Sequence, residues 1–399
     1  MLSIKNRRAI TCALGVTQTL AWASTYYLPA ILADGMAKTL STSSTMVFVA
    51  FTVALIASGV TGALIGRVID RRGGRGVLTA SSLLFAAGLF GLSQVSNVVG
   101  LFVAWLVVGV GMGMGLYDAA FSTLVRLFGA DARSAITGVT LFGGFASTIG
   151  WPLSHYFEVT FGWQGTCIAW SLIHLCVGLP LNAILPKAEL KHNEAVQHNK
   201  FVEKPTTINR IDFALVAFVF AAFSFITAAY ATHFPRLLGL LGMSAAAAVV
   251  IGSLFGPAQV AARLFEFGFL RKFHPLKVAL IASIFHPLGA LTIFLIGAPV
   301  AAVFACLHGV CNGMMTISKG AVPLALFGAQ GFGKRQGYLM LASTLAQASA
   351  PLGFGAAVDG FGVSAFMFSF SLSAMACAAL FVLKNRNLSG AILNMPLAK

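Results

Sequence analysis

Residues 66–75 read GRVIDRRGGR and hold four arginines together with one of the eleven acidic residues of the chain. This basic stretch joins two segments, 43–66 and 76–117, that contain no charged residue at all. A helix needs about 20 mostly apolar residues to cross the hydrocarbon core of a bilayer. Both segments are long enough and apolar enough to do so, and the arginines then lie in a short loop at the membrane surface.

The composition supports a membrane-embedded chain. Of the 399 residues, 58% are hydrophobic and 9% are charged, against about 25% charged in a typical soluble domain. Only helices and closed barrels satisfy their backbone hydrogen bonds inside lipid. The apolar residues form continuous blocks and do not alternate with polar ones, so we expect an all-α membrane protein. The six cysteines lie in these blocks without paired spacing, which predicts neither disulfides nor a metal site.

The chain contains twelve apolar stretches, and we expect each to form one membrane-spanning helix. The first is longer than the apolar part of a signal peptide and is followed by further spans, which favours an uncleaved helix over a cleaved signal. The expected spans are 9–31, 43–66, 76–95, 98–125, 134–157, 163–186, 211–234, 244–268, 277–297, 299–323, 335–357 and 362–383.

The positive charges indicate the orientation. If the N-terminus is cytoplasmic, 22 of the 26 Lys and Arg residues fall in cytoplasmic segments, and only Lys38 and Arg236 lie in outer loops. This asymmetry is typical of membrane proteins, whose cytoplasmic loops are rich in Lys and Arg. We therefore expect a bacterial-type inner-membrane protein with both termini in the cytoplasm. The net charge of +15 then has a topological explanation and gives no reason to expect nucleic acid as a partner.

The two halves of the chain share a spaced pattern. LFG at 127–129 and again at 326–328 is followed at similar intervals by a glycine, by Pro-Leu and by Phe-Gly. A repeat of this kind predicts duplicated structural units. We expect a six-helix bundle over 1–186, a polar cytoplasmic linker over 187–210 and a second six-helix bundle over 211–399.

The opening stretch has the pattern G-x-x-x-D-R-x-G-x-R, formed by Gly66, Asp70, Arg71, Gly73 and Arg75. It resembles the signature loop of the major facilitator superfamily, and the twelve spans, the central linker and the repeat extend the resemblance over the whole chain. The resemblance implies two six-helix bundles, usually in a monomer, that rock about a substrate held between them near the midplane of the membrane. In that family the loop is a conformational latch between the halves. The alternative is a basic cluster that only fixes orientation.

Three of the charged residues inside the spans stand out as functional candidates, because a charge at the middle of a span costs about 2.5–3.5 kcal/mol on the insertion scale. Asp118 could carry a coupling proton, or serve only a structural ion pair. The position of Arg263 is similar to that of an arginine in the monocarboxylate and oxalate/formate branch of the family, which implies an anionic substrate. Arg263 could instead extend to the interface or pair with Glu266. Lys319 could pair with Asp118 across the cavity, or also extend to the interface.

Aromatic side chains and a histidine complete the candidate substrate and proton site. Trp22 and Tyr26 share a face of the first span, and Tyr230 lies near the end of the seventh; each could line the substrate path or anchor a helix at the interface. His308 lies near two cysteines, but no second cluster completes a metal site, so helix packing or cavity lining is the expected role.

No nucleotide-binding motif or catalytic cluster appears, so we expect neither an enzyme nor a cofactor. The sequence predicts a secondary active transporter of a small polar or anionic organic solute, coupled to protons. Its expected partners are the substrate, the coupling proton and membrane lipid. The alternatives are a proton-antiport exporter of drugs or metabolites, and a membrane receptor, sensor or enzyme that kept the fold without transporting.

Overall fold

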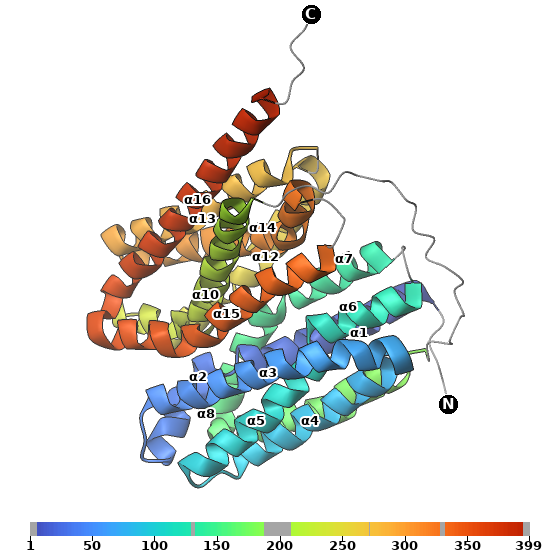
Figure 1. Ribbon diagram of the computed structural model, residues 1–399. Helices are drawn as coiled ribbons and strands as arrows, with labels where there is room; N and C mark the ends of the chain where they lie inside the picture. The colour runs from blue at the N-terminus through green and yellow to red at the C-terminus, as the bar shows by residue number, and fades with distance from the viewer. Residues whose placement is uncertain (1–5, 129–131, 187–208, 271, 328–331, 394–399) are drawn as a thin grey trace, which may run out of the picture.

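The structure is a computed structural model that describes residues 6–128, 132–186, 209–270, 272–327 and 332–393. The described residues form helices joined by short connections and contain no strand. Figure 1 shows two groups of helices packed side by side, one before and one after residues 187–208. We call residues 6–186 the N-terminal half and residues 209–393 the C-terminal half. The bounds of the predicted linker fall largely outside the described residues, so this division into domains stays a prediction.

The N-terminal half contains the first six spans, and several of them are assembled from more than one helix. The elements are α1 (Arg7–Ala21), η1 (Trp22–Tyr26), α2 (Pro29–Thr39), α3 (Ser44–Arg72), α4 (Arg75–Ser93), α5 (Val98–Gly115), α6 (Tyr117–Phe128), α7 (Ala132–Gly143), α8 (Ala146–Ile173), η3 (His174–Gly178) and α9 (Leu179–Ala183).

The C-terminal half contains the remaining six spans. Its elements are α10 (Arg210–Leu240), α11 (Ala245–Gly252), α12 (Phe255–Phe265), η4 (Glu266–Leu270), α13 (Pro275–Ile296), η5 (Ala298–Val300), α14 (Ala301–Phe327), α15 (Phe332–Phe361), η6 (Gly362–Ser364) and α16 (Ala365–Leu393).

Nine described helical stretches are long and apolar enough to cross a membrane. Two of them run for 49 residues, and each contains two spans joined at a glycine of the repeated Phe-Gly pair. Gly162 has φ 71° and Gly362 has φ 56°, a region that glycine enters without the steric cost of a Cβ. The first span, which is divided among α1, η1 and α2, is not among the nine. Twelve spans, as the sequence predicts, fit this all-helical fold.

Several spans predicted as continuous helices are interrupted. The fourth is divided at Leu116, whose backbone is extended (φ −85°, ψ −168°). The fifth is divided at Gly144 and Phe145, and the eighth at Ser253 and Leu254. Because discontinuous helices in transporters occur where substrate and ions bind, these breaks direct attention to the interface between the halves.

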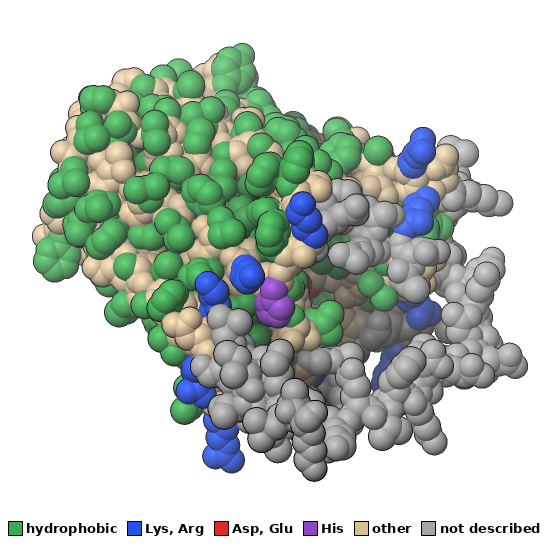
Figure 2. Space-filling view, turned by 90° about the horizontal axis from the view of Figure 1, so that it is seen from above, with side chains coloured by type: hydrophobic (Ala, Val, Ile, Leu, Met, Phe, Trp, Pro, Cys, Tyr) green, Lys and Arg blue, Asp and Glu red, His purple; other side chains and the backbone are tan. Residues whose placement is uncertain are grey.

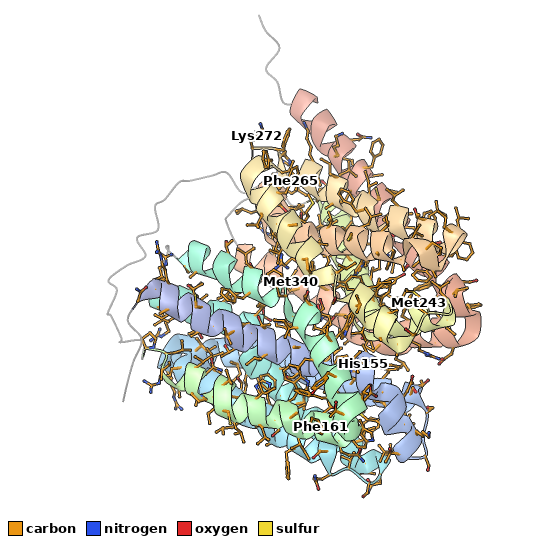
Figure 3. The ribbon with its side chains drawn as sticks, turned by 180° about the vertical axis from the view of Figure 1, so that it is seen from behind. His155, Phe161, Met243, Phe265, Lys272 and Met340 are labelled. Carbon is orange, nitrogen blue, oxygen red and sulfur yellow. The ribbon has the colours of Figure 1, made fainter. Side chains whose placement is uncertain are left out.

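The ends of the molecule differ in charge. We call the end that carries Arg71, Arg126 and Lys272 the basic end, and the opposite end, with Lys38 and Arg236, the far end. Figure 2 shows hydrophobic side chains over one part of the visible surface and Lys and Arg gathered on the other. In Figure 3, Lys272 and Met243 lie near opposite ends of the span formed by α11, α12 and η4.

Candidate functional site

Arg263 of α12 lies where the two halves meet. Its side chain is 7% exposed, and its Nη1 donates a 2.6 Å hydrogen bond to the backbone carbonyl of Thr140 on α7. Its Nε is buried, and no described residue accepts a hydrogen bond from it. The ion pairs among the described residues do not include Arg263. A buried guanidinium with a backbone carbonyl as its partner keeps the capacity to bind an anion.

Two tyrosines of the N-terminal half surround this guanidinium. Tyr117, the first residue of α6, interacts with Arg263, and a methyl group at Gly143 would overlap its hydroxyl. Tyr27, between η1 and α2, also interacts electrostatically with Arg263. The carbonyl of Tyr27 accepts a 3.1 Å bond from the Trp151 indole of α8. Three helical segments of the N-terminal half thus converge on one cation of the C-terminal half.

Further polar groups line the same place. Gln259, one turn before Arg263, and Ser147 at the start of α8 lie beside Tyr27. The Ser147 hydroxyl and the Trp22 indole N–H are buried, and neither has a hydrogen-bond partner among the described residues. Trp22 packs on the Tyr117 ring at 5.1 Å between centroids. Buried donors without partners carry a desolvation cost, which a bound acceptor would offset.

Two carboxyl groups lie close to this cluster. Asp118, directly after Tyr117, has an exposed side chain. Glu266 lies three residues after Arg263, 8% exposed, and its Oε2 has no partner among the described residues. It interacts electrostatically with Arg263, but the two form none of the described ion pairs. Arg263 therefore contacts Thr140 across the interface and is not neutralised by its own helix.

The fifth and eighth spans contact each other beside the cluster. Thr148 Oγ1 donates a 2.8 Å hydrogen bond to the carbonyl of Ser253. In a regular helix that carbonyl would accept from residue 257, but Pro257 has no N–H to give. A methyl group on Gly252 would overlap Trp151, and one on Gly256 would overlap Thr148. Glycines and a proline thus let the two helices approach closely.

The halves also meet at the far end. Asp359 of α15 accepts a 3.1 Å hydrogen bond from Thr45 of α3 and pairs with Arg236 of its own half at 2.6 Å. Deeper in, Gln347 donates to the Tyr26 hydroxyl at 3.3 Å. His233 stacks edge-on against Phe48 of the other half at 4.3 Å between ring centroids. These contacts join the two halves at the far end.

Lys319 contacts Ser224, and none of its described contacts is with Asp118. It is half-buried on α14 and donates a 2.7 Å hydrogen bond to Ser224 of α10. An Asp118–Lys319 pair is not among the described ion pairs, so its formation at another stage of a cycle stays a prediction.

Tyr230 and His308 lie inside the C-terminal half. Tyr230 is fully buried and bonds to Ser369 at 2.7 Å, while the Nδ1 atoms of His308 and His286 are 2.9 Å apart. Their hydrogen-bond partners belong to the same half. For His308 this is compatible with the helix-packing role named for it above; the roles proposed for both residues in the substrate and proton site stay predictions. Tyr26, by contrast, accepts a hydrogen bond from Gln347 of the other half, and Trp22 packs on Tyr26 and Tyr117.

The predicted latch loop begins at the end of α3. Gly73 has φ 81° and ends the helix with a 2.8 Å bond from its N–H to the carbonyl of Ile69. A methyl group on the next residue, Gly74, would overlap Thr123. These glycines allow the tight turn between α3 and α4 and its close approach to α6. The side chain of Asp70 lies outside the described residues, so its role as a latch stays a prediction.

The sequence reasoning missed Tyr27, Tyr117, Ser147 and Gln259. One signal was present: Gln259 lies four residues before Arg263 in an apolar segment, and residues four apart share a helix face. The tyrosines adjoin predicted residues, but only the fold shows that their side chains reach Arg263.

The fold of the chain resembles the folds of solved transporters. A bacterial homolog of the human lysosomal transporter Spinster, in an inward-facing and occupied conformation, is 14% identical over 96% of this chain and 98% of its own, with a TM-score of 0.70. The D-xylose-proton symporter is 15% identical over 94% and 97%, with a TM-score of 0.74. The nucleoside transporter NupG is 14% identical over 94% and 99%, with a TM-score of 0.73.

These identities establish the fold alone, and no curated protein sequence matches the chain. The family assignment rests on the family model, which matches residues 14–303, well over half of the chain. The chain belongs to the Major Facilitator Superfamily.

Proposed function

We propose that this transporter moves a small organic anion by alternating access and couples that movement to protons. The observation that carries the proposal is Arg263, a buried guanidinium at the interface that donates to a backbone carbonyl, interacts with Tyr117 and takes part in none of the described ion pairs. A guanidinium binds a carboxylate through two parallel hydrogen bonds. The buried hydroxyl of Ser147, which lies beside Tyr27, supplies a further donor.

Asp118 and Glu266 are the carboxyl groups proposed to carry the coupling proton. Carboxyl groups inside transmembrane spans mark candidate sites of proton transfer. Glu266 interacts electrostatically with Arg263 without forming one of the described ion pairs, so its protonation would remove a negative charge from near the guanidinium and favour a bound anion. Proton binding and anion binding would then be linked.

The basic end is proposed to face the cytoplasm of a bacterial-type inner membrane, because Lys- and Arg-rich loops stay on that side. With the halves joined at the far end by the contacts of Asp359 and Tyr26, the described conformation is proposed to deny access from outside. A monomer suffices, since both sides of the site come from one chain.

The test is transport by purified protein in liposomes with an imposed pH gradient. Proton flux is recorded while radiolabelled lactate, pyruvate and succinate are added in turn. Flux that depends on a carboxylate and is lost in Arg263→Met, but kept in Lys38→Gln, supports the proposal. Lys38 is the matched control because it is an exposed cation at the far end.

The competing function is proton-antiport export of a cationic drug or metabolite. The exposed carboxyl group of Asp118 beside the aromatic ring of Tyr117 favours it, because both attract cations. Flux evoked by lipophilic cations and unchanged in Arg263→Met would establish export in place of anion transport.

A further inference from the structure

The fourth span is broken partway along its length, between α5 and α6. Leu116 has an extended backbone, although its N–H still bonds to Met112 at 3.0 Å and its carbonyl accepts from Ala120 at 3.2 Å. Among the described residues, no backbone amide donates to the carbonyl of Gly115. A buried carbonyl without a donor is costly, so this break needs a partner from outside its own helix.

Gln18 of α1 supplies that partner. Its Nε2 donates a 2.6 Å hydrogen bond to the Gly115 carbonyl, and its side chain is 1% exposed. Its Oε1 is buried, and no described residue donates to it. A buried amide oxygen without a donor lowers the stability of the fold, so stability alone does not explain the presence of Gln18 here. The bond to the broken helix is the contact that this side chain provides.

The break determines where the next two residues lie. Tyr117 and Asp118 follow Leu116 directly, and a helix that continued through Leu116 would place both on other faces, since each helical residue turns by about 100°. As the structure stands, Tyr117 packs on Trp22 and interacts with Arg263, while Asp118 is exposed.

We propose that Gln18 is a positioning residue: it holds the fourth span open at Gly115 and thereby places Tyr117 at Arg263 and Asp118 in its exposed position. The effect of Gln18 on transport rests on the proposed function, because it acts through residues of the proposed site. Its effect on the shape of the fourth span does not depend on any substrate.

A comparison within the same half separates this role from ordinary packing. Ser171 of α8 also donates to a backbone carbonyl of another helix, that of Ala86, at 2.8 Å. Ala86 lies inside the regular helix α4, where the carbonyl also has a helical donor. Loss of Ser171 therefore leaves no carbonyl without a donor, whereas loss of Gln18 does. Ser171→Ala is the matched control.

The first experiment measures the shape of the fourth span without any substrate. In a cysteine-free background, Asp118→Cys is alkylated with a water-soluble maleimide, alone and combined with Gln18→Leu or Ser171→Ala. We expect Gln18→Leu to change the alkylation rate at least fivefold and Ser171→Ala to leave it within twofold. Should Gln18→Leu fold poorly in size-exclusion chromatography, Gln18→Asn, polar but one methylene too short, is used in its place. Equal rates in all three proteins would overturn the proposal.

The second experiment uses the native carboxyl group. Uptake of radiolabelled lactate, pyruvate and succinate is measured across external pH for Gln18→Leu and Ser171→Ala. We expect Gln18→Leu to raise KM and shift the pH profile, whereas a purely structural defect would lower the maximal rate alone. If the unmodified protein moves none of these anions, the proposed function fails, and the alkylation rates still decide the role of Gln18.

Discussion

The hydrogen bond between Thr45 and Asp359 is predicted to determine how often the far end opens. It joins the two halves directly, while the Arg236–Asp359 pair joins two helices of one half. A hydrogen bond to a charged group contributes about 1.5–3 kcal/mol when buried. Asp359 is 41% exposed and Arg236 34%, so solvent screening reduces the contribution of the Thr45 bond to about 1 kcal/mol. That energy corresponds to about a fivefold change in an equilibrium constant.

The perturbation is Thr45→Val, which keeps the shape of the side chain and removes the donor. Spin labels at Lys38 of the N-terminal half and Leu240 of the C-terminal half, both exposed at the far end, report the separation by double electron–electron resonance. We expect the minor population at longer distance to grow about fivefold. Thr292→Val, whose hydroxyl bonds to its own helix at 2.7 Å, is the control.

The substitution Asp359→Asn, measured with the same spin labels, tests the same hydrogen bond from its acceptor side. The amide keeps an acceptor for Thr45 but loses the charge that strengthens it, so its effect should lie between those of the wild type and Thr45→Val. Distance distributions that stay identical in Thr45→Val and in the wild type would refute the reasoning. The closure would then rest on the packing of Phe48 and His233 instead.

Three further predictions follow from the site and the turns. Arg263→Lys should raise the KM for a carboxylate at least tenfold and keep some transport, because an ammonium group retains the charge but not the two parallel hydrogen bonds; uptake kinetics test this. Asp118→Asn and Glu266→Gln should each be assayed for proton-driven accumulation and for substrate exchange, and the carrier of the coupling proton should lose accumulation but keep exchange. Gly162→Ala, at φ 71°, should lower the unfolding free energy by about 1–2 kcal/mol relative to Gly320→Ala, where a methyl group meets nothing within 4 Å; equal thermal stability of the two would contradict the steric argument.

The sequence predicted most of the fold because its signals are local. Apolar blocks of sufficient length predict spans, basic loops predict orientation, and the repeated Phe-Gly pair predicts turns, each from residues close together in the sequence. Gly162 and Gly362 form two such turns, with positive φ angles. The interruption at Leu116 was not predictable in this way. Its stability depends on Gln18, almost a hundred positions earlier in the chain, and no local pattern connects them.

The site was predictable only in part, for a related reason. Arg263 and Asp118 stand out because charges are rare in spans, whereas Tyr27, Ser147 and Gln259 are common in helices and become notable only through their neighbours. Tyr230 was selected by its place near a helix end, yet its hydroxyl bonds within its own half. Position along a helix gives depth in the membrane, but the face it turns to another helix depends on packing.

Pro257 makes the hydrogen bond between Thr148 and Ser253 possible without taking part in it. The bond from Thr148 to Ser253 contains no atom of Pro257, yet the carbonyl is available because this proline withholds an amide. Replacing Pro257 with alanine would leave both bonded residues unchanged and offer the carbonyl a competing donor inside its own helix. A choice of mutations based only on the interactions each side chain makes would therefore omit Pro257. To test the contact between the fifth and eighth spans, the informative substitution is Pro257→Ala, one helical turn away from the Thr148–Ser253 hydrogen bond.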